Sequence, residues 1–322
     1  MSSSLVDATI DALTFTGRGL TRKRAVAASS TAIARGTYVE TDFLLSLSPD
    51  QRARSIAIAR TLAAMRSRRG QTAFGPSAAL LHGIEVWPLP QRIHMVATQV
   101  RSGNSTQFPA VFLERKEIAS ATSTQFHRIG DIRFATTNFA GLELPTLGAV
   151  IFHCALTDPA ESAFITLCQA LRLLADSEEN SGENWRVLAN DIRQTLLESS
   201  YSLPSHTRGA ARARWLIEYC DAGCDSVDSA RLLWLLRSAG IGGLVTDYPV
   251  SESGGQWRVD IAEPDARLAL SIGDEHPTIP GWTVLPFSRG DLDQPADLVA
   301  QVRNAIEDSG SEVTPIAPYA FG

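Results

Sequence analysis

The hydrophobic pattern is clearest in residues 72–98, which predict a strand, a short helix and a second strand. The first strand ends at a Gly-Pro pair, and Pro76 suits the first turn of a helix because its missing N–H is not needed there. Small apolar residues follow as far as Gly83, which can adopt the positive φ of a helix C-terminus. Residues 93–97 then place apolar side chains on every second position, the period of a strand. We therefore predict a helix that packs closely against a sheet.

The N-terminal segment has the layout of a small winged helix-turn-helix. Residues 2–13 predict a helix, and residues 20–34 predict a second helix that begins with the basic sequence TRKR. The sequence RGTYV at residues 35–39 predicts a turn into a strand, in the place of the wing. Ser48 then caps a long helix over residues 50–69, whose arginines either contact phosphate or are simply solvated.

Beyond residue 98 the pattern changes to strands and then to helices. We predict strands at residues 110–115 and 131–137, joined by a Ser- and Thr-rich loop at residues 119–125. The spacing of apolar residues then predicts four consecutive helices. They span residues 145–155, 158–174, 183–198 and 206–220.

The last hundred residues predict a helix, four strands and a closing helix that share one sheet. The first helix, at residues 226–238, has a broad leucine face that must be buried. We expect the strands at 244–250, 256–261, 267–272 and 282–287, and the closing helix at 291–306. Residues 312–322 have no periodicity and are predicted to be irregular.

Composition indicates a globular protein whose charge is unevenly distributed. Of the 322 residues, 44% are hydrophobic and 20% are charged, and no apolar run is long enough to predict a membrane span. Residues 1–75 carry 11 Lys and Arg against 5 Asp and Glu, a balance of +6. Residues 76–204 and 205–322 have balances of −4 and −8. A basic head on an acidic body is expected if only the head contacts phosphate, and a solvated basic surface is the alternative.

The N-terminus has neither a basic n-region nor a long apolar h-region, which predicts a cytoplasmic protein without a signal peptide. Four cysteines are too few for a disulfide framework at this length. Cys220 and Cys224 are four residues apart, the wrong spacing for a zinc knuckle. We expect buried or half-buried thiols. His82, at a helix end, is expected to bond a backbone carbonyl, and Ser77 to be a first-turn residue rather than a nucleophile.

Two short motifs, RGTYV at residues 35–39 and SAALLHG at residues 77–83, resemble the wing and the strongest signature of one family. The family is that of the actinobacterial type IV, abortive-infection antitoxin-like transcriptional regulators. The end of the chain resembles the restriction-endonuclease-type domain related to very-short-patch repair nucleases. The residues that carry this second resemblance are RVD at 258–260, AEPDARLAL at 262–270, His276 and Gly281-Trp282.

The resemblance implies an α/β (α+β) protein with a degenerate N-terminal winged helix and a C-terminal restriction-endonuclease-like domain. We predict a winged-helix-like basic head with its following helix at 1–70 and a central strand-helix and helical region at 71–222. The endonuclease-like α/β domain is expected at 223–310 and an irregular tail at 311–322. The recognition helix ahead of the wing is shorter here than in the family by several residues.

Nucleases of this type hold Mg²⁺ with at least two carboxylates, usually with a lysine as the base. The resemblance places one carboxylate at Asp260. Ser271 occupies the position of the expected Glu, and Gly273 that of the expected Asp. The only lysines in the chain, Lys23 and Lys116, are far from this region of the sequence. These departures predict that catalysis has been lost.

A rearranged catalytic site is the alternative, and it would draw on nearby acids and one histidine. Its members would be Asp228, Asp260, Asp274, Glu275 and His276, with Asp260 and Asp274 as metal ligands. The side chains predicted to contact DNA are Arg18, Arg22, Lys23, Arg24, Arg35 and Tyr38.

These observations predict an antitoxin-like or transcriptional-regulator-like DNA-binding protein whose nuclease-like domain has lost catalysis and needs no cofactor. One alternative is a Mg-dependent nuclease with a rearranged site. Another is a protein-interaction module whose helical middle binds a toxin or other partner. The sequence predicts no membrane partner.

Overall fold

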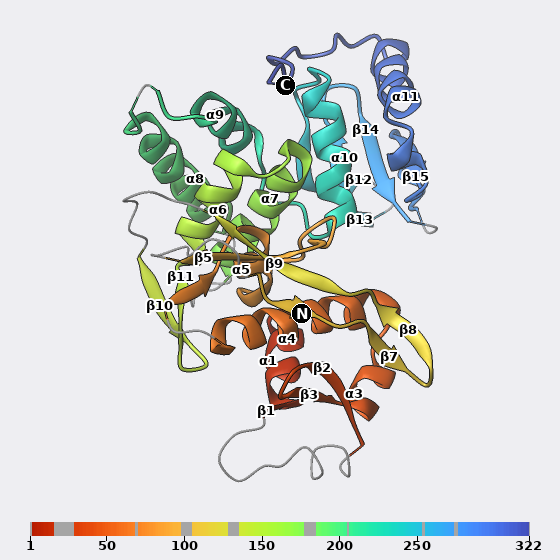
Figure 1. The fold of residues 1–322 in the computed structure, drawn as a ribbon. Coiled ribbons are helices and arrows are strands. Elements are labelled where there is room, and N and C mark those ends of the chain that lie inside the picture. The colour runs from red at the N-terminus through yellow and green to blue at the C-terminus, as the bar shows by residue number, and fades with distance from the viewer. Residues whose placement is uncertain are drawn as a thin grey trace. The chain divides into compact units, whose positions relative to one another are not determined.

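The computed structural model describes residues 2–15, 29–67, 70–97, 105–127, 135–176, 185–204, 206–252, 255–273 and 276–321. They form two compact units, Met1–Cys154 and Ala155–Gly322 (Figure 1). The boundary between the units falls inside the predicted central region, 71–222. Both units contain helices and sheets, which confirms the α/β class at that level. In the part of the chain that is described, no helix has the length and apolar character needed to cross a membrane.

The first unit begins with a helix and a small antiparallel sheet, coloured red in Figure 1. The elements are α1 (Ser2–Asp11), β1 (Leu13–Phe15), β2 (Ser30–Ala34) and β3 (Thr37–Glu40). The strand order is β1-β3-β2, so that Val39 of β3 pairs with Leu13 on one side and with Thr31 on the other. A turn at Arg35 and Gly36 joins β2 to β3, and Gly36 has a φ of 77°. The predicted first helix and the predicted strand after the glycine turn are both confirmed.

The prediction of a helix over residues 20–34 is wrong for its last five residues, which form β2. Thr31 pairs with Val39, and the side chain of Ile33 is fully buried. β-branched residues at alternate positions suit a strand that has a partner, and the partner lies beyond the turn in the sequence. Residues 16–28, which include Arg18, Arg22, Lys23 and Arg24, lie outside the described residues.

The long helix predicted after Ser48 is α4 (Pro49–Ser67), and a short helix, α3 (Thr41–Ser46), precedes it. The Gln51 N–H donates to Ser48 Oγ at 3.3 Å, and the Ser48 N–H donates to Gln51 Oε1 at 3.2 Å. This reciprocal capping box starts the helix. Between α1 and α4, Thr9 Oγ1 donates to Ser55 Oγ at 3.1 Å. The buried apolar cluster of this part consists of Ala12, Ile33, Val39, Leu44, Ile56, Ala59 and Val111.

The segment with the clearest sequence pattern folds as predicted, into β4 (Gln71–Ala73), α5 (Gly75–Leu81) and β5 (Ile93–Ala97). Pro76 lies in the first turn of α5, and Gly83 follows the helix with a φ of 84°. Every residue of α5 is buried, because its small side chains allow close packing. The sheet has the order β4-β5-β9-β6, in which β9 is Thr122–His127 and β6 is Gln107–Phe108.

The loop predicted at residues 119–125 is wrong, because Thr122–His127 is strand β9. This strand runs parallel to β5 and antiparallel to β6 (Gln107–Phe108). Thr124 is buried, and its hydroxyl accepts a hydrogen bond from the Thr106 N–H at 2.8 Å. Threonine is β-branched and suits a strand, but only the neighbouring strands distinguish this segment from a polar loop.

Two hairpins complete the strands of the first unit. They are β7 (Val111–Leu113) with β8 (Lys116–Ala119), and β10 (Thr136–Phe139) with β11 (Leu142–Pro145). The strand predicted at 110–115 is confirmed. The strand predicted at 131–137 is confirmed only from residue 136, because residues 128–134 lie outside the described part.

The four helices predicted in the middle of the chain are all confirmed. They are α6 (Leu147–Thr157), α7 (Ala160–Asp176), α8 (Trp185–Tyr201) and α9 (Ala210–Tyr219). Within the second unit, α7 contacts α8, α9 and α10. The buried ring of Phe164 on α7 lies 5.5 Å from the ring of Trp234 and 6.5 Å from that of Trp215.

The predicted C-terminal sheet is confirmed, and so are the helix that precedes it and the helix that follows it in the sequence. The elements are α10 (Val227–Ser238), β12 (Val245–Glu252), β13 (Gly255–Glu263), β14 (Leu268–Ile272), β15 (Thr283–Phe287) and α11 (Pro295–Asp308). The strand order is β12-β13-β14-β15, with only the last pair parallel. The Ser229 N–H donates to Ser226 Oγ at 3.1 Å and caps α10. The leucine side of α10 is buried as expected.

The C-terminal tail has neither helix nor strand beyond Asp308, as predicted, yet it is anchored to the second unit. Pro315 forms a β-bridge with Ile241. The Trp215 indole N–H donates to the carbonyl of Ala317 at 2.9 Å, and the ring of Tyr319 lies 5.1 Å from that of Trp234. These contacts come from distant parts of the sequence and leave no periodic pattern in the tail.

Candidate functional site

Asp260, the carboxylate that the resemblance selects, lies on β13, an inner strand of the C-terminal sheet. Its Oδ2 accepts a hydrogen bond from the Ile272 N–H of β14 at 2.8 Å. The register pairs Ile261 with Leu270, so Asp260 lies opposite Ser271 on the neighbouring strand. Burial is the main cause of the raised pKa of the Asp260 carboxyl, whereas the hydrogen bond from the Ile272 N–H lowers this pKa. The negative charges of Asp225 and Asp247 raise this pKa further.

Two of the other predicted catalytic residues are described, and neither is among the charged groups that affect the pKa of Asp260. Asp228 lies in the first turn of α10, and its carboxylate pairs with the Arg289 guanidinium at 2.8 Å. His276 is exposed. Asp274 and Glu275 lie outside the described residues. Among the residues that are described, no group of three or more His, Cys, Asp or Glu side chains has the arrangement of a metal site.

The carboxylates that affect Asp260 are Asp225 and Asp247, which sequence reasoning did not select. Asp225 directly precedes the N-cap of α10, and Asp247 lies on β12 with a φ of 48°. This backbone conformation is uncommon for a residue other than glycine. Neither residue belongs to a recognisable spacing pattern, so the sequence carried no signal for their proximity to Asp260.

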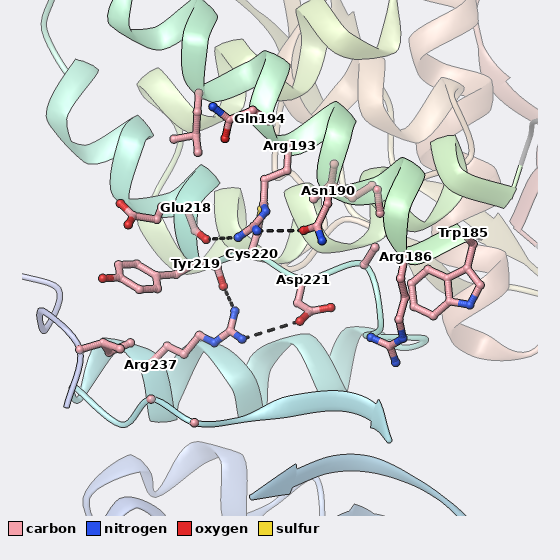
Figure 2. Close-up of a pocket in the computed structure, with 17 residues that line it drawn as sticks. Trp185, Arg186, Asn190, Arg193, Gln194, Glu218, Tyr219, Cys220, Asp221 and Arg237 are labelled. Atoms are coloured by element: carbon pink, nitrogen blue, oxygen red, sulfur yellow. Dashed lines mark hydrogen bonds and ion pairs between the residues drawn. The ribbon is translucent and has the colours of Figure 1, made fainter. Parts of the chain in front are cut away.

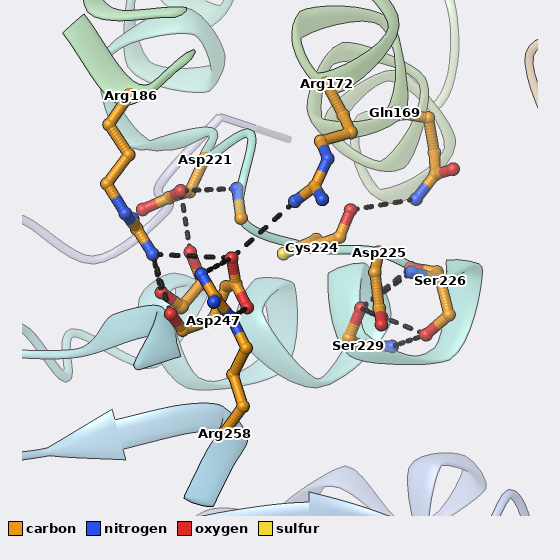
Figure 3. Close-up of polar contacts among 12 residues, drawn as sticks. Gln169, Arg172, Arg186, Asp221, Cys224, Asp225, Ser226, Ser229, Asp247 and Arg258 are labelled. Carbon is orange, nitrogen blue, oxygen red and sulfur yellow. Dashed lines mark hydrogen bonds and ion pairs between the residues drawn. The ribbon is translucent and has the colours of Figure 1, made fainter. Parts of the chain in front are cut away.

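Asp247 is surrounded by guanidinium groups (Figure 3). Its carboxylate accepts hydrogen bonds from Nε and Nη2 of Arg258, the second at 2.8 Å, and this pairing raises the pKa of Arg258. Arg172 and Arg186 each approach Asp247 Oδ2 to 3.8 Å. The ring of Trp185 lies 4.7 Å from the Arg172 guanidinium and 4.4 Å from that of Arg186. Three arginines therefore surround the Asp247 carboxylate, while the charged groups that act on Asp260 itself are the acids Asp225 and Asp247.

Next to this cluster, α8 and the end of α9 line a polar pocket of about 610 Å³ (Figure 2). Arg193 donates to the Glu218 carbonyl at 2.5 Å and to the Asn190 side chain at 2.9 Å. Arg237 donates to the Tyr219 carbonyl and lies 3.7 Å from the Asp221 carboxylate. The guanidinium groups of this pocket are therefore oriented mainly by main-chain carbonyls, and they link the helices to the C-terminal sheet.

The N-terminal candidates for DNA contact differ in exposure. Arg35 lies in the turn between β2 and β3 and is exposed, whereas Tyr38 on β3 is only 6% exposed. The buried ring of Tyr38 is not available to a ligand in this arrangement. Of Arg35 and Tyr38, only Arg35 is therefore exposed for contact with DNA. The four basic candidates between Arg18 and Arg24 lie outside the described residues.

The arginines of α4 that are described serve the fold of the first unit. Arg52 donates to the carbonyls of Leu44 and Leu47 at 2.7 and 2.9 Å. Arg54 pairs with Glu85, and the Arg66 guanidinium lies 4.1 Å from the centre of the Phe15 ring. The sequence predicted either phosphate contact or solvation for them, and these internal contacts are a third role.

The expectations for the conspicuous residues around α5 are confirmed. His82 Nε2 lies 2.7 Å from the Pro145 carbonyl oxygen, and burial lowers the pKa of this histidine. Ser77, in the first turn of α5, accepts a hydrogen bond from the His94 N–H at 2.9 Å. All four cysteines are buried, as predicted. Burial is the main cause that raises the pKa of Cys220, and a hydrogen bond with Cys168 is the main cause that raises the pKa of Cys224.

A histidine cluster in the first unit was missed by sequence reasoning. His94 Nδ1 and His127 Nε2 are 3.1 Å apart, and their rings stack at 4.9 Å. The ring of Phe74 lies 5.1 Å from that of His127 and 4.0 Å from that of His153. Burial, together with the charge of His127, lowers the pKa of His94 and of His153 to about 4. The three histidines are far apart in the sequence, so no sequence motif predicts the cluster.

The geometry therefore offers two surfaces for a functional hypothesis, the exposed β2–β3 turn and the arginine cluster beside Asp260. Comparisons with family models, curated proteins and solved structures found no match to this chain.

Proposed function

We propose that the chain is an antitoxin-like or regulator-like DNA-binding protein whose nuclease-like C-terminal domain has lost catalysis. The observation that carries the proposal is the arrangement of α1, β1 and the β2–β3 hairpin. An antiparallel sheet of order β1-β3-β2 that follows a helix matches the strand order of a winged helix. Arg35 is exposed at the hairpin turn, the position from which a wing reaches phosphate.

The distribution of charge supports the same proposal. Residues 1–75 carry a balance of +6, but Arg52, Arg54 and Arg66 of α4 are engaged within the fold. The basic side chains proposed to contact DNA are therefore Arg18, Arg22, Lys23, Arg24 and Arg35. Contacts of this kind release counterions from DNA, which makes binding fall steeply as salt rises.

Two features of the C-terminal sheet favour the absence of hydrolysis. Asp260 uses Oδ2 to bond the Ile272 N–H and faces Ser271, which cannot supply the second carboxylate. Asp228 is paired with Arg289.

The binding test is fluorescence anisotropy with a labelled duplex of mixed sequence at several salt concentrations. We expect log K to fall linearly with log salt, by a slope of about −0.9 for each phosphate contacted. The triple variant Arg22→Ala, Lys23→Ala, Arg24→Ala should make this slope shallower by about three. Arg35→Ala should weaken binding by itself, with a change in slope of about one.

The matched control removes the same number of exposed charges from the second unit, at Arg208, Arg267 and Arg289. This control should leave most of the affinity and of the salt dependence intact. Absence of binding at low salt would refute the proposal. Equal losses in the two triple variants would show that binding depends on net charge alone and would refute the role of the N-terminal head.

The catalytic part of the proposal is tested separately by plasmid nicking with Mg²⁺ or Mn²⁺. We expect no cleavage above that of the Asp260→Asn variant. Cleavage that requires Asp260 would instead support the alternative of a Mg-dependent nuclease with a rearranged site, in which Asp274 and Glu275 supply the remaining carboxylates.

A further inference from the structure

A second pocket lies entirely within the first unit, and its volume is about 670 Å³. Its wall is formed by α4, by Ser77 and Leu80 of α5, by residues 89–93, by Gln107 and by residues 118–123. A volume of this size falls within the range of about 300–1,000 Å³ that is typical of small-molecule sites. None of the roles described above uses this pocket.

Arg60 of α4 is the most unusual residue in the wall. Its side chain is only 6% exposed, and Nη2 donates to the Pro109 carbonyl at 2.6 Å. Nε is buried and has no hydrogen-bond partner. Burial lowers the pKa of Arg60, and no carboxylate among the described residues counteracts this effect. A buried guanidinium of this kind destabilises the folded protein unless something else compensates its charge and its unpaired donor.

The charge of the pocket wall is one-sided. Arg60 and Arg92 are its charged members, and none of the described residues that line it is Asp or Glu. Glu117 on β8 accepts a hydrogen bond at 2.6 Å from the hydroxyl of Ser120, which lines the pocket. The exposed Glu117 side chain makes no ion pair with Arg60. The pocket therefore has a net positive charge.

The rest of the wall is suited to an organic molecule with both polar and apolar parts. Hydroxyl and amide groups come from Thr61, Ser77, Gln91, Gln107, Thr122 and Ser123. Several of them are already oriented, as Thr61 donates to the Ala57 carbonyl and Thr122 to the Gln91 carbonyl. Apolar side chains come from Ile56, Leu80, Leu89, Ile93 and Ile118.

We propose that this pocket binds a small organic anion, whose carboxylate or phosphate group is held by Arg60. The anion would neutralise the guanidinium and accept the hydrogen bonds that Pro109 leaves unused, because a guanidinium presents five donors in a fixed fork. The apolar part of the ligand lies against Ile56, Leu80 and Ile118. Arg92, exposed at the wall, adds attraction for the negative charge. This site is independent of the proposed DNA contacts.

The test uses the purified full-length chain and three anionic probes: inorganic phosphate, AMP and benzoate. Adenosine and benzyl alcohol serve as their neutral counterparts. Isothermal titration calorimetry should detect saturable binding of at least one anion, and thermal unfolding should shift to higher temperature with that anion. Comparison of AMP and phosphate with benzoate distinguishes a phosphate ligand from a carboxylate ligand.

The discriminating variant is Arg60→Met, which keeps an unbranched side chain of similar length without the charge. We expect its Kd for the bound anion to rise at least about tenfold, a loss expected when a charged hydrogen-bond partner is removed. The matched control is Arg54→Met on the same helix, where Arg54 pairs with Glu85 outside the pocket wall, and it should bind as the unmodified protein does. DNA binding should be retained in Arg60→Met.

Three outcomes would overturn the proposal. They are no saturable binding of any of the three anions at millimolar concentration, equal binding of an anion and its neutral counterpart, and unchanged affinity in Arg60→Met. If Arg60→Met does not fold, Arg60→Lys and Arg92→Ala replace it. Lysine keeps the charge without the fork, so Arg60→Lys should weaken binding, and unchanged affinity in both replacements would again overturn the proposal.

Discussion

Acidification is expected to destabilise the first unit through the buried histidines His94 and His153. The rings of His127 and Phe74 lie against this cluster, and Arg92 adds a positive charge near His94. Both His94 and His153 have a pKa of about 4, so both are neutral near pH 7. Protonation would place positive charge among buried rings and beside another histidine.

The sign of the effect follows from the protons that each state binds. Unfolded histidine has a pKa of about 6.5, so between about pH 6.5 and pH 4 the unfolded chain binds protons that the folded chain does not. Stability is therefore lost as the pH falls through this window. At about pH 5, a folded pKa of about 4 corresponds to a loss of about 2 kcal/mol for each histidine, and about 4 kcal/mol for the two together.

Two measurements check this prediction. An NMR titration of the Cε1–H signals of the histidines gives each pKa directly. Hydrogen exchange of peptides from the first unit, measured at two pH values and corrected for the intrinsic rate, gives the change in its unfolding free energy. The double variant His94→Gln, His153→Gln should lose the share of the pH dependence that these two histidines cause, while His82 and His127, whose pKa burial also lowers, keep theirs. The control His206→Gln, His276→Gln changes two exposed histidines of the second unit and should keep it.

The reasoning is refuted if His94 and His153 titrate close to the ordinary histidine pKa. It is also refuted if the His94→Gln, His153→Gln variant loses as much stability on acidification as the unmodified protein, because another group would then bind the protons.

The other predictions concern the second unit and the role of a left-handed glycine. Gly209→Ala should cost about 3 kcal/mol or more in urea unfolding, because Gly209 has a φ of 83° and an added Cβ would overlap the Leu156 carbonyl oxygen. Gly141→Ala has a similar φ of 76° with open space around it, and it should cost only about 1 kcal/mol; equal costs would contradict the clash. Asp260→Ala should cost about 1–3 kcal/mol because it leaves the Ile272 N–H unpaired, whereas Asp260→Asn keeps an acceptor and should change stability by less than about 1 kcal/mol. Equal losses in the two Asp260 variants would show that the hydrogen bond is not the reason.

Local sequence patterns were enough to predict most helices and the C-terminal sheet. Ser48 and Ser226 precede helices that they cap, and Gly83 follows a helix at a positive φ. These signals act within a few residues, so a sequence contains all the information they need. The wrong predictions at residues 30–34 and 119–125 depend instead on residues that are distant in the sequence. Small and hydroxyl-bearing residues there became strands because partners distant in the sequence supplied the hydrogen bonds.

The candidate sites were less predictable than the fold, since each depends on side chains that meet only after folding. Asp260 was selected by resemblance, but its carboxylate neighbours Asp225 and Asp247 were not. Arg60 was one of several arginines on a predicted helix, and nothing in the spacing separated it from Arg54. Burial and the lack of a carboxylate partner separate them in the structure.

The sequence by itself determined where most helices and strands of this protein lie, because periodicity and capping depend on near neighbours along the chain. It also determined the uneven distribution of charge along the chain. The tertiary structure decided which polar groups are buried together, as in the histidine cluster and around Asp247. The physical reason is that burial and the distance between charges set pKa and pairing, and both are properties of the packed chain rather than of sequence spacing.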